Sequence, residues 1–301
     1  MMLLQACING ARDVAEHPWL SADETVVAGD AARAVAAGAG EVHVHPKDAA
    51  GRDSLDAEDV ARWVRAVRAA TPGVPVGVTT GAWAEPDVGR RLASIEAWTE
   101  LPDHASVNWH EAGAEEVAAL LVGRGVAVEA GLWDAAGLEV WKRSPLRSGC
   151  LRVLIELPDE PAEVVRDHAE AMIAHVALEE PDLPILLHGE EGSAWPAFDL
   201  AVELGRDSRI GLEDTLLLPD GSTAPATRRW CVQRSGGCGP SGRVCIRPGA
   251  ERIRARCDLP DRVQAWTRLR MLRTRRRTMR LSARPSGVCR GCSPGGFRSS
   301  R

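Results

Sequence analysis

The sequence has 301 residues and a formal net charge of −5, a length that suits one large domain of barrel size or two smaller domains. It contains no apolar run long enough for a transmembrane helix, and its start lacks the basic and apolar regions of a signal peptide. The first 227 residues carry only two cysteines, Cys7 and Cys150. We therefore expect a cytoplasmic protein that is not membrane-bound and has no disulfide bonds.

Strand-like and helix-like segments alternate over the first 215 residues. Apolar runs predict eight strands, at 3–8, 41–45, 74–79, 104–108, 126–132, 151–155, 184–188 and 209–213. Amphipathic runs between them predict helices at 21–38, 54–71, 114–122, 160–177 and 195–205. Strict alternation predicts a (β/α)8 TIM barrel, an α/β fold, although a doubly wound open sheet gives a similar pattern.

Polar residues at the ends of these strands favour the barrel. TIM-barrel enzymes build their active sites at the C-terminal ends of the strands. Nearly every predicted strand ends in side chains that can bind or catalyse, namely Asn9, His43, His45, Thr79, Thr80, Asn108, His110, Glu129, His188, Glu213 and Asp214. A single strand that ends in polar side chains would be ordinary. A set of polar side chains at nearly every strand end, converging on one opening of the barrel, indicates a catalytic barrel.

Residues 42–48 read Val-His-Val-His-Pro-Lys-Asp and carry the clearest chemical signal. Because side chains alternate along a strand, His43 and His45 project from the same face. Pro46 cannot donate a backbone hydrogen bond and therefore ends the strand. Two imidazoles at the C-terminal end of a strand can bind one metal ion and leave room for a third ligand and a substrate. The alternative interpretation is a pair of hydrogen-bonded core histidines.

The last quarter of the sequence differs sharply in composition. Residues 1–227 contain 17 basic and 39 acidic residues, a balance of −22. Residues 228–301 contain 20 arginines, no lysine and three acidic residues, a balance of +17, together with six of the eight cysteines. We therefore expect a catalytic barrel over residues 1–225 and an Arg- and Cys-rich, disordered tail over residues 226–301.

A frameshift explains this tail best. Residues 226–234 read Ala-Thr-Arg-Arg-Trp-Cys-Val-Gln-Arg, and GC-rich codons for them, read in the frame shifted back by one base, encode Asn-Ala-Ala-Leu-Val-Arg-Ala-Ala. That peptide combines an Asn cap with strong helix formers, as the eighth helix of a barrel requires. We therefore expect the eighth helix to be missing or altered, and the protein to be marginally soluble and weakly active.

A nucleic-acid-binding module in the tail is an alternative of another class. The arginines, however, show no sustained helical stripe and no interleaved aromatic residues, so we expect no specific nucleic-acid binding. A structural zinc site in the tail would use Cys231, Cys238, Cys245 and Cys257, whose spacings lack the paired C-x2-C pattern. The single C-x2-C pair, at 289–292, has no second pair nearby.

Five motifs occur in a specific order and at barrel spacing: 9–11 (Asn-Gly-Ala), 43–45 (His-Val-His), 79–81 (Thr-Thr-Gly), 102–108 (Pro-Asp-His-Ala-Ser-Val-Asn) and 209–214 (Arg-Ile-Gly-Leu-Glu-Asp). With these motifs, residues 3–223 resemble the β-keto acid cleavage enzymes, zinc-dependent (β/α)8 barrels typified by 3-keto-5-aminohexanoate cleavage enzyme. The resemblance implies a retro-Claisen-type exchange, in which a β-keto acid and acetyl-CoA give a new acyl-CoA and acetoacetate. It also implies a homo-oligomer.

The resemblance implies a role for each matching residue. His43, His45 and Glu213 would bind Zn2+, because two imidazoles and one carboxylate leave coordination positions open for a substrate. Asp214 and Arg209 would form the catalytic dyad, in which the arginine and the metal keep the aspartate ionised; an ordinary salt bridge is the structural alternative. Thr79 and Ser106 would contact the substrate unless their hydroxyls only bond to backbone. Further candidate pocket residues are Asn108, Arg12, Glu129 and His188.

Two departures from the family bear on specificity. The prototype has acidic residues that can hold a substrate ammonium, and this chain has Arg12 and Gly131 at the corresponding positions. Arg12 would repel an ammonium, so we expect neutral or anionic β-keto acids to be preferred. A metal-dependent hydrolase on the same barrel is the nearest alternative enzyme. Those hydrolases usually carry the histidine pair on the first strand and add a carbamylated lysine, whereas Lys47 lies past the second predicted strand.

Overall fold

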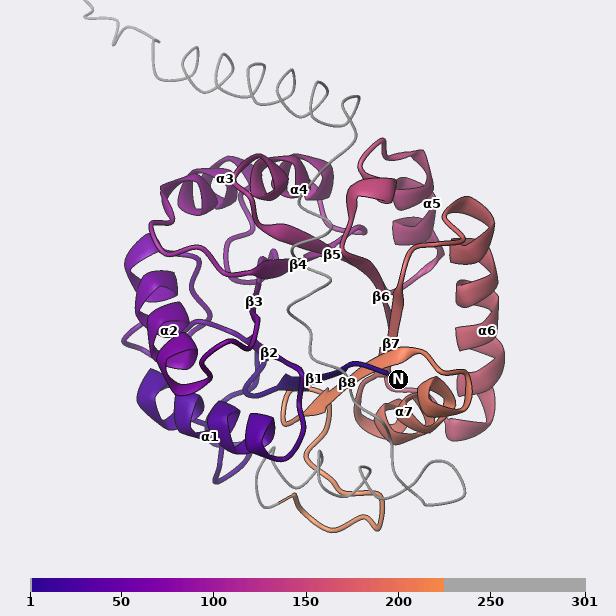
Figure 1. The fold of residues 1–301 in the computed structure, drawn as a ribbon, viewed down its shortest axis with the longest axis horizontal. Coiled ribbons are helices and arrows are strands. Elements are labelled where there is room, and N and C mark those ends of the chain that lie inside the picture. The colour runs from indigo at the N-terminus through magenta and orange to yellow at the C-terminus, as the bar shows by residue number, and fades with distance from the viewer. Residues whose placement is uncertain (1, 225–301) are drawn as a thin grey trace, which may run out of the picture.

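The computed structural model describes residues 2–224, whose strands close into one parallel barrel (Figure 1). In chain order the strands are β1 (Leu4–Cys7), β2 (Glu41–Val44), β3 (Val76–Thr79), β4 (His104–Asn108), β5 (Ala127–Leu132), β6 (Arg152–Leu157), β7 (Ile185–Gly189) and β8 (Asp207–Gly211). Each strand pairs in parallel with the next, and β8 pairs with β1. This closure confirms the predicted TIM barrel and excludes the open sheet.

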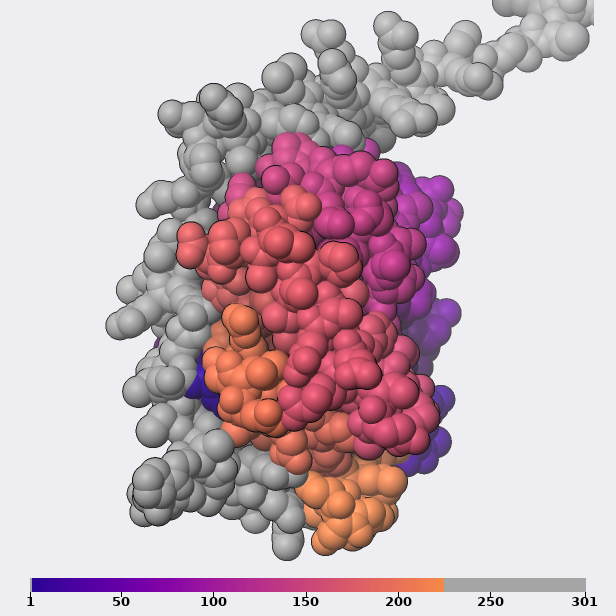
Figure 2. Space-filling model, turned by 90° about the vertical axis from the view of Figure 1, so that its right-hand side faces the viewer, coloured from indigo at the N-terminus to yellow at the C-terminus, as the bar shows by residue number. Residues whose placement is uncertain are grey.

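Helices surround the barrel, and Figure 2 shows those of the second half of the chain covering one side of it. They are α1 (Glu24–Ala36), α2 (Ala57–Ala70), α3 (Val88–Ala97), α4 (Ala114–Gly123), α5 (Ala135–Arg143), α6 (Ala162–Glu179) and α7 (Ala194–Glu203), with 3-10 turns at Arg147–Gly149 and Glu191–Ser193. The sequence did not predict α3 and α5. Both are short, with ten and nine residues, and bury only two and three residues, so their apolar positions are too few to mark a helix in the sequence.

The segment after β8 bears on the predicted loss of the eighth helix. Residues 212–224 form turns and one bridge between Leu217 and Thr223, and no helix follows β8 within the described residues. The prediction of a disordered tail over residues 226–301 lies outside the described part of the chain. None of the described helices is long and apolar enough to cross a membrane.

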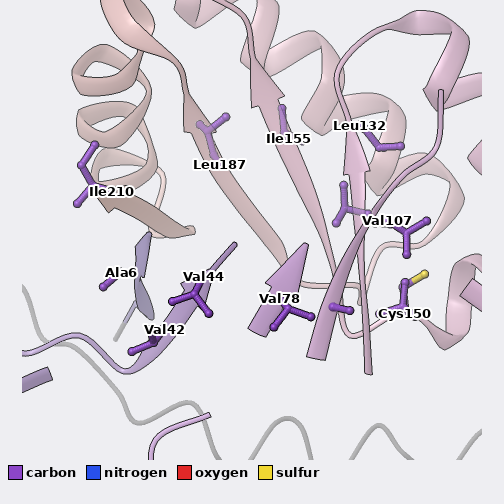
Figure 3. Packing of buried hydrophobic residues seen from close by; sticks show 14 of the residues in the cluster. Ala6, Val42, Val44, Val78, Val107, Leu132, Cys150, Ile155, Leu187 and Ile210 are labelled. Atoms are coloured by element: carbon purple, nitrogen blue, oxygen red, sulfur yellow. The ribbon is translucent and has the colours of Figure 1, made fainter. Parts of the chain in front are cut away.

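The apolar core lies between the strands and the helices. Side chains such as Val42 and Val44 of β2, Val78 of β3 and Ile210 of β8 belong to it and are almost fully buried (Figure 3). The intervening residues of the same strands, such as His43, face the barrel interior instead. This alternation places the polar side chains inside the barrel and holds them at fixed positions.

The barrel interior contains a buried polar layer near the N-terminal ends of the strands. Arg152 of β6 pairs with Glu41 of β2 and Glu129 of β5, and its Nε donates to Glu129 Oε1 at 2.8 Å. Gln5 Nε2 donates to the same oxygen at 3.0 Å, and His104 Nε2 lies 3.7 Å from Glu129 Oε2. Burial alone would raise the pKa of Glu129, but Arg152 and His104 outweigh it and lower the pKa to about 2. Glu129 is thus tied into this layer.

We expect Arg152→Leu to be strongly destabilising. The substitution leaves the carboxylates of Glu41 and Glu129 buried without their cation, and breaking a buried ion pair in this way typically costs about 3–5 kcal/mol. The matched control is Arg166→Leu, because Arg166 also pairs with two acidic residues but on the exposed surface of α6. Urea unfolding should show a much larger loss for Arg152→Leu. Equal losses in the two variants would contradict a structural role for the buried layer.

Candidate active site

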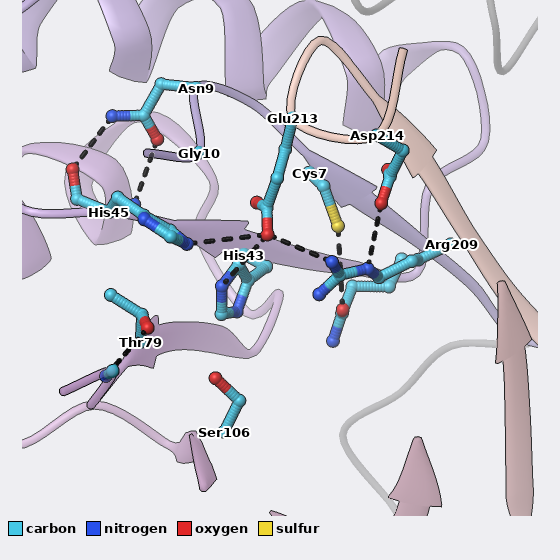
Figure 4. A network of polar contacts seen from close by, with 12 residues as sticks. Cys7, Asn9, Gly10, His43, His45, Thr79, Ser106, Arg209, Glu213 and Asp214 are labelled. Atoms are coloured by element: carbon cyan, nitrogen blue, oxygen red, sulfur yellow. Dashed lines mark hydrogen bonds and ion pairs between the residues drawn. The ribbon is translucent and has the colours of Figure 1, made fainter. Parts of the chain in front are cut away.

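Three potential metal ligands meet at the C-terminal end of the barrel (Figure 4). His43 belongs to β2, His45 follows directly after β2, and Glu213 lies in the turn after β8. Glu213 Oε1 is 3.4 Å from His45 Nε2 and 3.8 Å from His43 Nε2, and one potential ligand atom from each residue lies within 4.8 Å of the other two. The structure therefore brings the predicted triad together across β1, which lies between β2 and β8.

The triad fits a metal ion. His43 Nδ1 and Glu213 Oε2 are buried and have no hydrogen-bond partner within residues 2–224. His45 Nδ1 is 2.8 Å from Asp53 Oδ2, so a hydrogen on Nδ1 leaves the Nε2 lone pair free for a metal. Two imidazole nitrogens and one carboxylate oxygen form a donor set found in catalytic zinc sites, which keep a coordination position open.

The electrostatics of the triad also suit a cation. Burial lowers the pKa of His43 to about 3, so this imidazole is neutral and its lone pair is available. Burial opposes protonation of His45 as well, but Glu213 and Asp53 raise its pKa to about 9. Burial opposes ionisation of Glu213, yet Arg209 and the two histidines hold its pKa well below the usual range. A metal that binds here must displace the proton of His45, and this competition grows as the pH falls.

The Asn9-Gly10 segment positions this centre, which gives the 9–11 motif a physical reason. Asn9 Nδ2 donates to the backbone oxygen of His45 at 2.8 Å, and the His45 backbone N–H donates to Asn9 Oδ1 at 2.9 Å. Gly10 has a φ of +61°, and a Cβ on it would lie 2.6 Å from Glu213 Cγ. The side chain of Glu213, a candidate metal ligand, can therefore pack here only against a glycine.

We expect Gly10→Ala to weaken zinc binding because the new methyl group would displace Glu213. Changes that misorient a metal ligand typically cost about 10–100-fold in affinity. The matched control is Gly205→Ala, because Gly205 has a φ of +62° and nothing within 4 Å of a Cβ. Both variants place a side chain at a positive φ and therefore share the same backbone strain. A difference in zinc affinity between them, measured by titration with a competing chelator, then reports the contact with Glu213. Equal zinc affinity in the two variants would show that Gly10 does not position the ligand.

A cavity of about 420 Å³ opens beside the triad. Thr79, Ser106 and Asn108, predicted to contact the substrate, line it together with Arg12. Glu129 does not line the cavity, because it lies in the buried layer below. The structure therefore corrects its predicted role in substrate binding. The remaining lining residues are Ala11, Glu16, His43, His45, Trp83, Trp133, Glu156, Glu190, Glu191, Arg209 and Glu213.

The two members of the predicted dyad occupy different positions relative to this cavity. Arg209 lines it, and its guanidinium donates from Nε to Asp214 Oδ1 at 3.1 Å and from Nη2 to Glu213 Oε1 at 3.0 Å. Asp214 is 1% exposed and does not line the cavity. Its Oδ1 is also 3.4 Å from His188 Nδ1. Asp214 therefore reaches the cavity through Arg209, whereas His188 does not line the cavity.

The sequence model of the β-keto acid cleavage enzymes matches residues 2–248 of this chain. The chain belongs to the β-keto acid cleavage enzyme family. The match covers the histidine pair, the Asn-Gly-Ala motif and the Glu213 turn. A comparison with curated proteins gave no match.

Solved structures similar to this family member share its barrel. ObcA in binary complex with oxaloacetate has a TM-score of 0.61 at 17% identity, covering 78% of this chain and 66% of that chain. A ternary complex of ObcA with a C4-CoA adduct and oxalate gives 0.60 at 15% identity, with coverage of 72% and 63%. Type I 3-dehydroquinate dehydratase from Clostridium difficile gives 0.51 at 13% identity, with coverage of 77% and 91%. The chain thus spans slightly less than two thirds of ObcA, and these identities show the fold alone.

The sequence did not single out several residues of the site in this family member. Asp53 orients His45, and the Trp83 ring stacks on that imidazole with centroids 5.9 Å apart while Nε1 donates to Asp53 at 2.8 Å. Glu156 and Glu190 line the cavity from the C-terminal ends of β6 and β7. Their position just beyond the predicted strands, which stopped at 155 and 188, was the available signal.

Proposed function

We propose that this chain is a zinc-dependent acyl-exchange enzyme that converts a β-keto acid and acetyl-CoA into a new acyl-CoA and acetoacetate. In this exchange the acyl group leaves C2 of the keto acid for the CoA sulfur, and the acetyl group takes its place on C2. The observation that carries the proposal is the meeting of His43, His45 and Glu213 beside Arg209, at a cavity in a member of this family. ObcA, which shares the barrel, has been solved with oxaloacetate and with a C4-CoA adduct, which supports this class of substrates.

Zinc held by His43, His45 and Glu213 would supply a Lewis acid for the keto acid. The protein's own contribution begins with Arg209, whose fixed guanidinium lines the cavity and can stabilise negative charge that develops on the substrate. Its position is set by hydrogen bonds to Glu213 and Asp214. The arginine therefore needs no reorganisation during the reaction.

Hydroxyl and amide groups complete the cavity wall and can orient the substrate. Thr79 Oγ1 accepts a hydrogen bond from the Gly81 backbone N–H at 3.1 Å, which leaves its hydroxyl hydrogen for a substrate oxygen. Ser106 lies on the neighbouring strand, paired with Thr79 in register. These donors at strand ends support binding of a carboxylate or carbonyl oxygen next to the metal ligands.

A metal-dependent hydrolase receives less support. Lys47, the residue that a carbamate would require, is buried, and its Nζ donates to Asp53 Oδ1 at 2.6 Å and to the Gly10 carbonyl at 3.1 Å. Lys47 is thus already engaged by Asp53 and by the Gly10 backbone. The tail that could bind nucleic acid lies outside the described residues.

The decisive experiment is acetyl-CoA dependence. The zinc-loaded full chain is incubated with 3-oxohexanoate, with and without acetyl-CoA, and acetoacetate and butyryl-CoA are measured by mass spectrometry. We expect both products in equal amounts, and only when both substrates are present. Release of free acids without acetyl-CoA would indicate a hydrolase, and no acetoacetate from any β-keto acid in a panel would refute the proposed exchange.

A further inference from the structure

The turn that carries Glu213 and Asp214 is held from two sides by neighbouring loops. On one side the Nε of Arg12 donates to the Glu213 backbone oxygen at 3.2 Å. On the other side the Glu191 backbone N–H donates to the Asp214 backbone oxygen at 2.8 Å. Arg12 lies in the loop after β1, and Glu191 lies in the 3-10 turn after β7. Because β1 and β7 flank β8, the two contacts bracket the end of that strand.

A salt bridge joins the two holding residues to each other. The Arg12 guanidinium pairs through Nη2 with the Glu191 carboxylate, and its Nη1 lies 3.2 Å from Glu16 Oε2. The Arg12 side chain is 15% exposed, so its ion pairs are less screened by water than those of the open surface. An arginine suits this position, because its planar fork can donate to a carbonyl oxygen and to a carboxylate at once. Arg12 and Glu191 thus form a closed ring of contacts with the turn, which we call the clamp.

The backbone conformation of Glu191 indicates that the clamp is a built feature. Glu191 has a φ of +45°, the only positive φ of a non-glycine residue among those that the structure describes. A left-handed conformation is unfavourable for a residue with a Cβ and persists only where the surrounding contacts outweigh it. In this conformation Glu191 donates its N–H to the Asp214 carbonyl and places its carboxylate against Arg12. The contacts of the clamp therefore compensate the unfavourable backbone.

The turn after β8 depends on such contacts more than the other strand ends do. Each of β1–β7 is followed by a helix, whereas no helix follows β8 within the described residues. Hydrogen bonds inside the turn run from the N–H groups of Asp214 and Thr215 to the Gly211 oxygen, at 3.1 and 3.2 Å. These bonds set the shape of the turn but not its place relative to β2. The place of the Glu213 backbone is set by the neighbouring loops.

We propose that Arg12 and Glu191 are positioning residues, which hold the turn so that Glu213 meets the two histidines and Asp214 meets Arg209. The inference rests on the proposed function for the metal and the reaction. Neither residue lies in the five motifs that match the family. A turn released from the clamp would carry Glu213 away from the other two ligands. Changes that misorient a metal ligand in this way typically cost about 10–100-fold in metal affinity.

Arg12→Ala, Glu191→Ala and the double variant test the clamp in the full chain. Alanine keeps a Cβ at residue 191, so the preference of the backbone there changes little. Zinc affinity is measured without substrate by titration with a competing chelator, and the visible spectrum of the cobalt-loaded protein reports the coordination geometry. We expect each single variant to bind zinc about tenfold more weakly and to show an altered cobalt spectrum. The double variant should lose less than the product of the two single losses, because both residues act through one ring.

Hydrogen exchange of the turn tests the clamp without a metal. The Asp214 and Thr215 amides donate inside the turn, so they are protected only while the turn keeps its shape and place. In the metal-free protein we expect both amides to exchange about tenfold faster in Arg12→Ala and in Glu191→Ala, the usual scale of losing a hydrogen bond to a charged group. The exchange of the amides in β4 and β5 should stay as in the parent.

The matched control is the pair of variants Arg166→Ala and Glu203→Ala. Like Arg12, Arg166 pairs with a glutamate four residues further on, Glu170, and with a distant one, Glu203, but on the exposed surface of α6 and α7. Both control variants should match the parent in zinc affinity and in exchange of the turn.

Unchanged exchange in both clamp variants would overturn the clamp. Faster exchange with unchanged zinc affinity would overturn its positioning role. A raised KM in Arg12→Ala, with zinc affinity and exchange as in the parent, would make Arg12 a substrate ligand instead. If the parent protein binds no zinc, the proposed function fails, and hydrogen exchange then decides the clamp alone.

Discussion

His43→Ala and Glu213→Ala should each lose stoichiometric zinc and, with it, nearly all acyl-exchange activity. Each variant removes one of three ligands, and the two that remain cannot hold the ion in the required geometry. Because His43 and Glu213 lie at the C-terminal end of the barrel, away from the polar layer near the strand N-termini, the fold should remain largely intact. Zinc content is measured by atomic emission after dialysis, and folding by circular dichroism.

The informative control for these variants is His104→Ala. The structure contains a second cluster, Glu41, His104 and Glu129, whose potential ligand atoms also lie within 4.8 Å of one another. Arg152 pairs with both carboxylates there, so we expect no metal at that position. His104→Ala should therefore keep its zinc. Zinc lost from this variant and retained in both triad variants would move the metal centre to the buried layer.

Asp214→Asn should lower turnover by about 10²–10⁴-fold while zinc is retained. Loss of a group that takes part in proton transfer typically has an effect of this size. Here the substitution also removes the anionic partner of Arg209 Nε and changes the hydrogen bonding of His188, so the guanidinium at the cavity wall loses its fixed position. Because Asp214 does not line the cavity, the effect should appear mainly in kcat rather than in KM.

Asp207→Asn is a matched control for this variant. Asp207 is a buried aspartate at the other end of β8, and its Oδ1 accepts a hydrogen bond from the Leu3 backbone N–H at 2.9 Å. Its substitution should lower stability without lowering kcat. Turnover of Asp214→Asn within about threefold of the parent would remove Asp214 from the mechanism.

The sequence predicted the strands, but it did not predict how far along the barrel axis each side chain lies. Glu129 faces the barrel interior as its alternation required, yet it is the third residue of β5 and lies below the cavity. Periodicity gives the face of a strand, whereas depth depends on the stagger between strands, which is a tertiary property. The predicted β8, at 209–213, ran two residues too far because the buried Leu212 extends the apolar pattern into the turn.

The charge of individual side chains was equally hard to predict without their neighbours. Arg12 suggested a preference for neutral or anionic substrates, which stays a prediction, but nothing in the sequence indicated that the folded chain would pair Arg12 with Glu191, 179 positions away. His45 could be placed in the candidate metal site from its spacing, whereas Asp53, which contacts its ring, lies in a loop without a periodic signal. Local patterns thus identified the candidate ligands, and long-range contacts determined their electrostatic partners.

The candidate metal site lies across the seam where the barrel closes. His43 and His45 follow β2, Glu213 follows β8, and β1 lies between these strands. Nearly the whole described barrel must therefore be synthesised before all three side chains can bind one ion. Binding and closure then reinforce each other, because an ion that binds only the closed ring stabilises it by mass action. An ion bound by all three residues would link the two ends of the sheet.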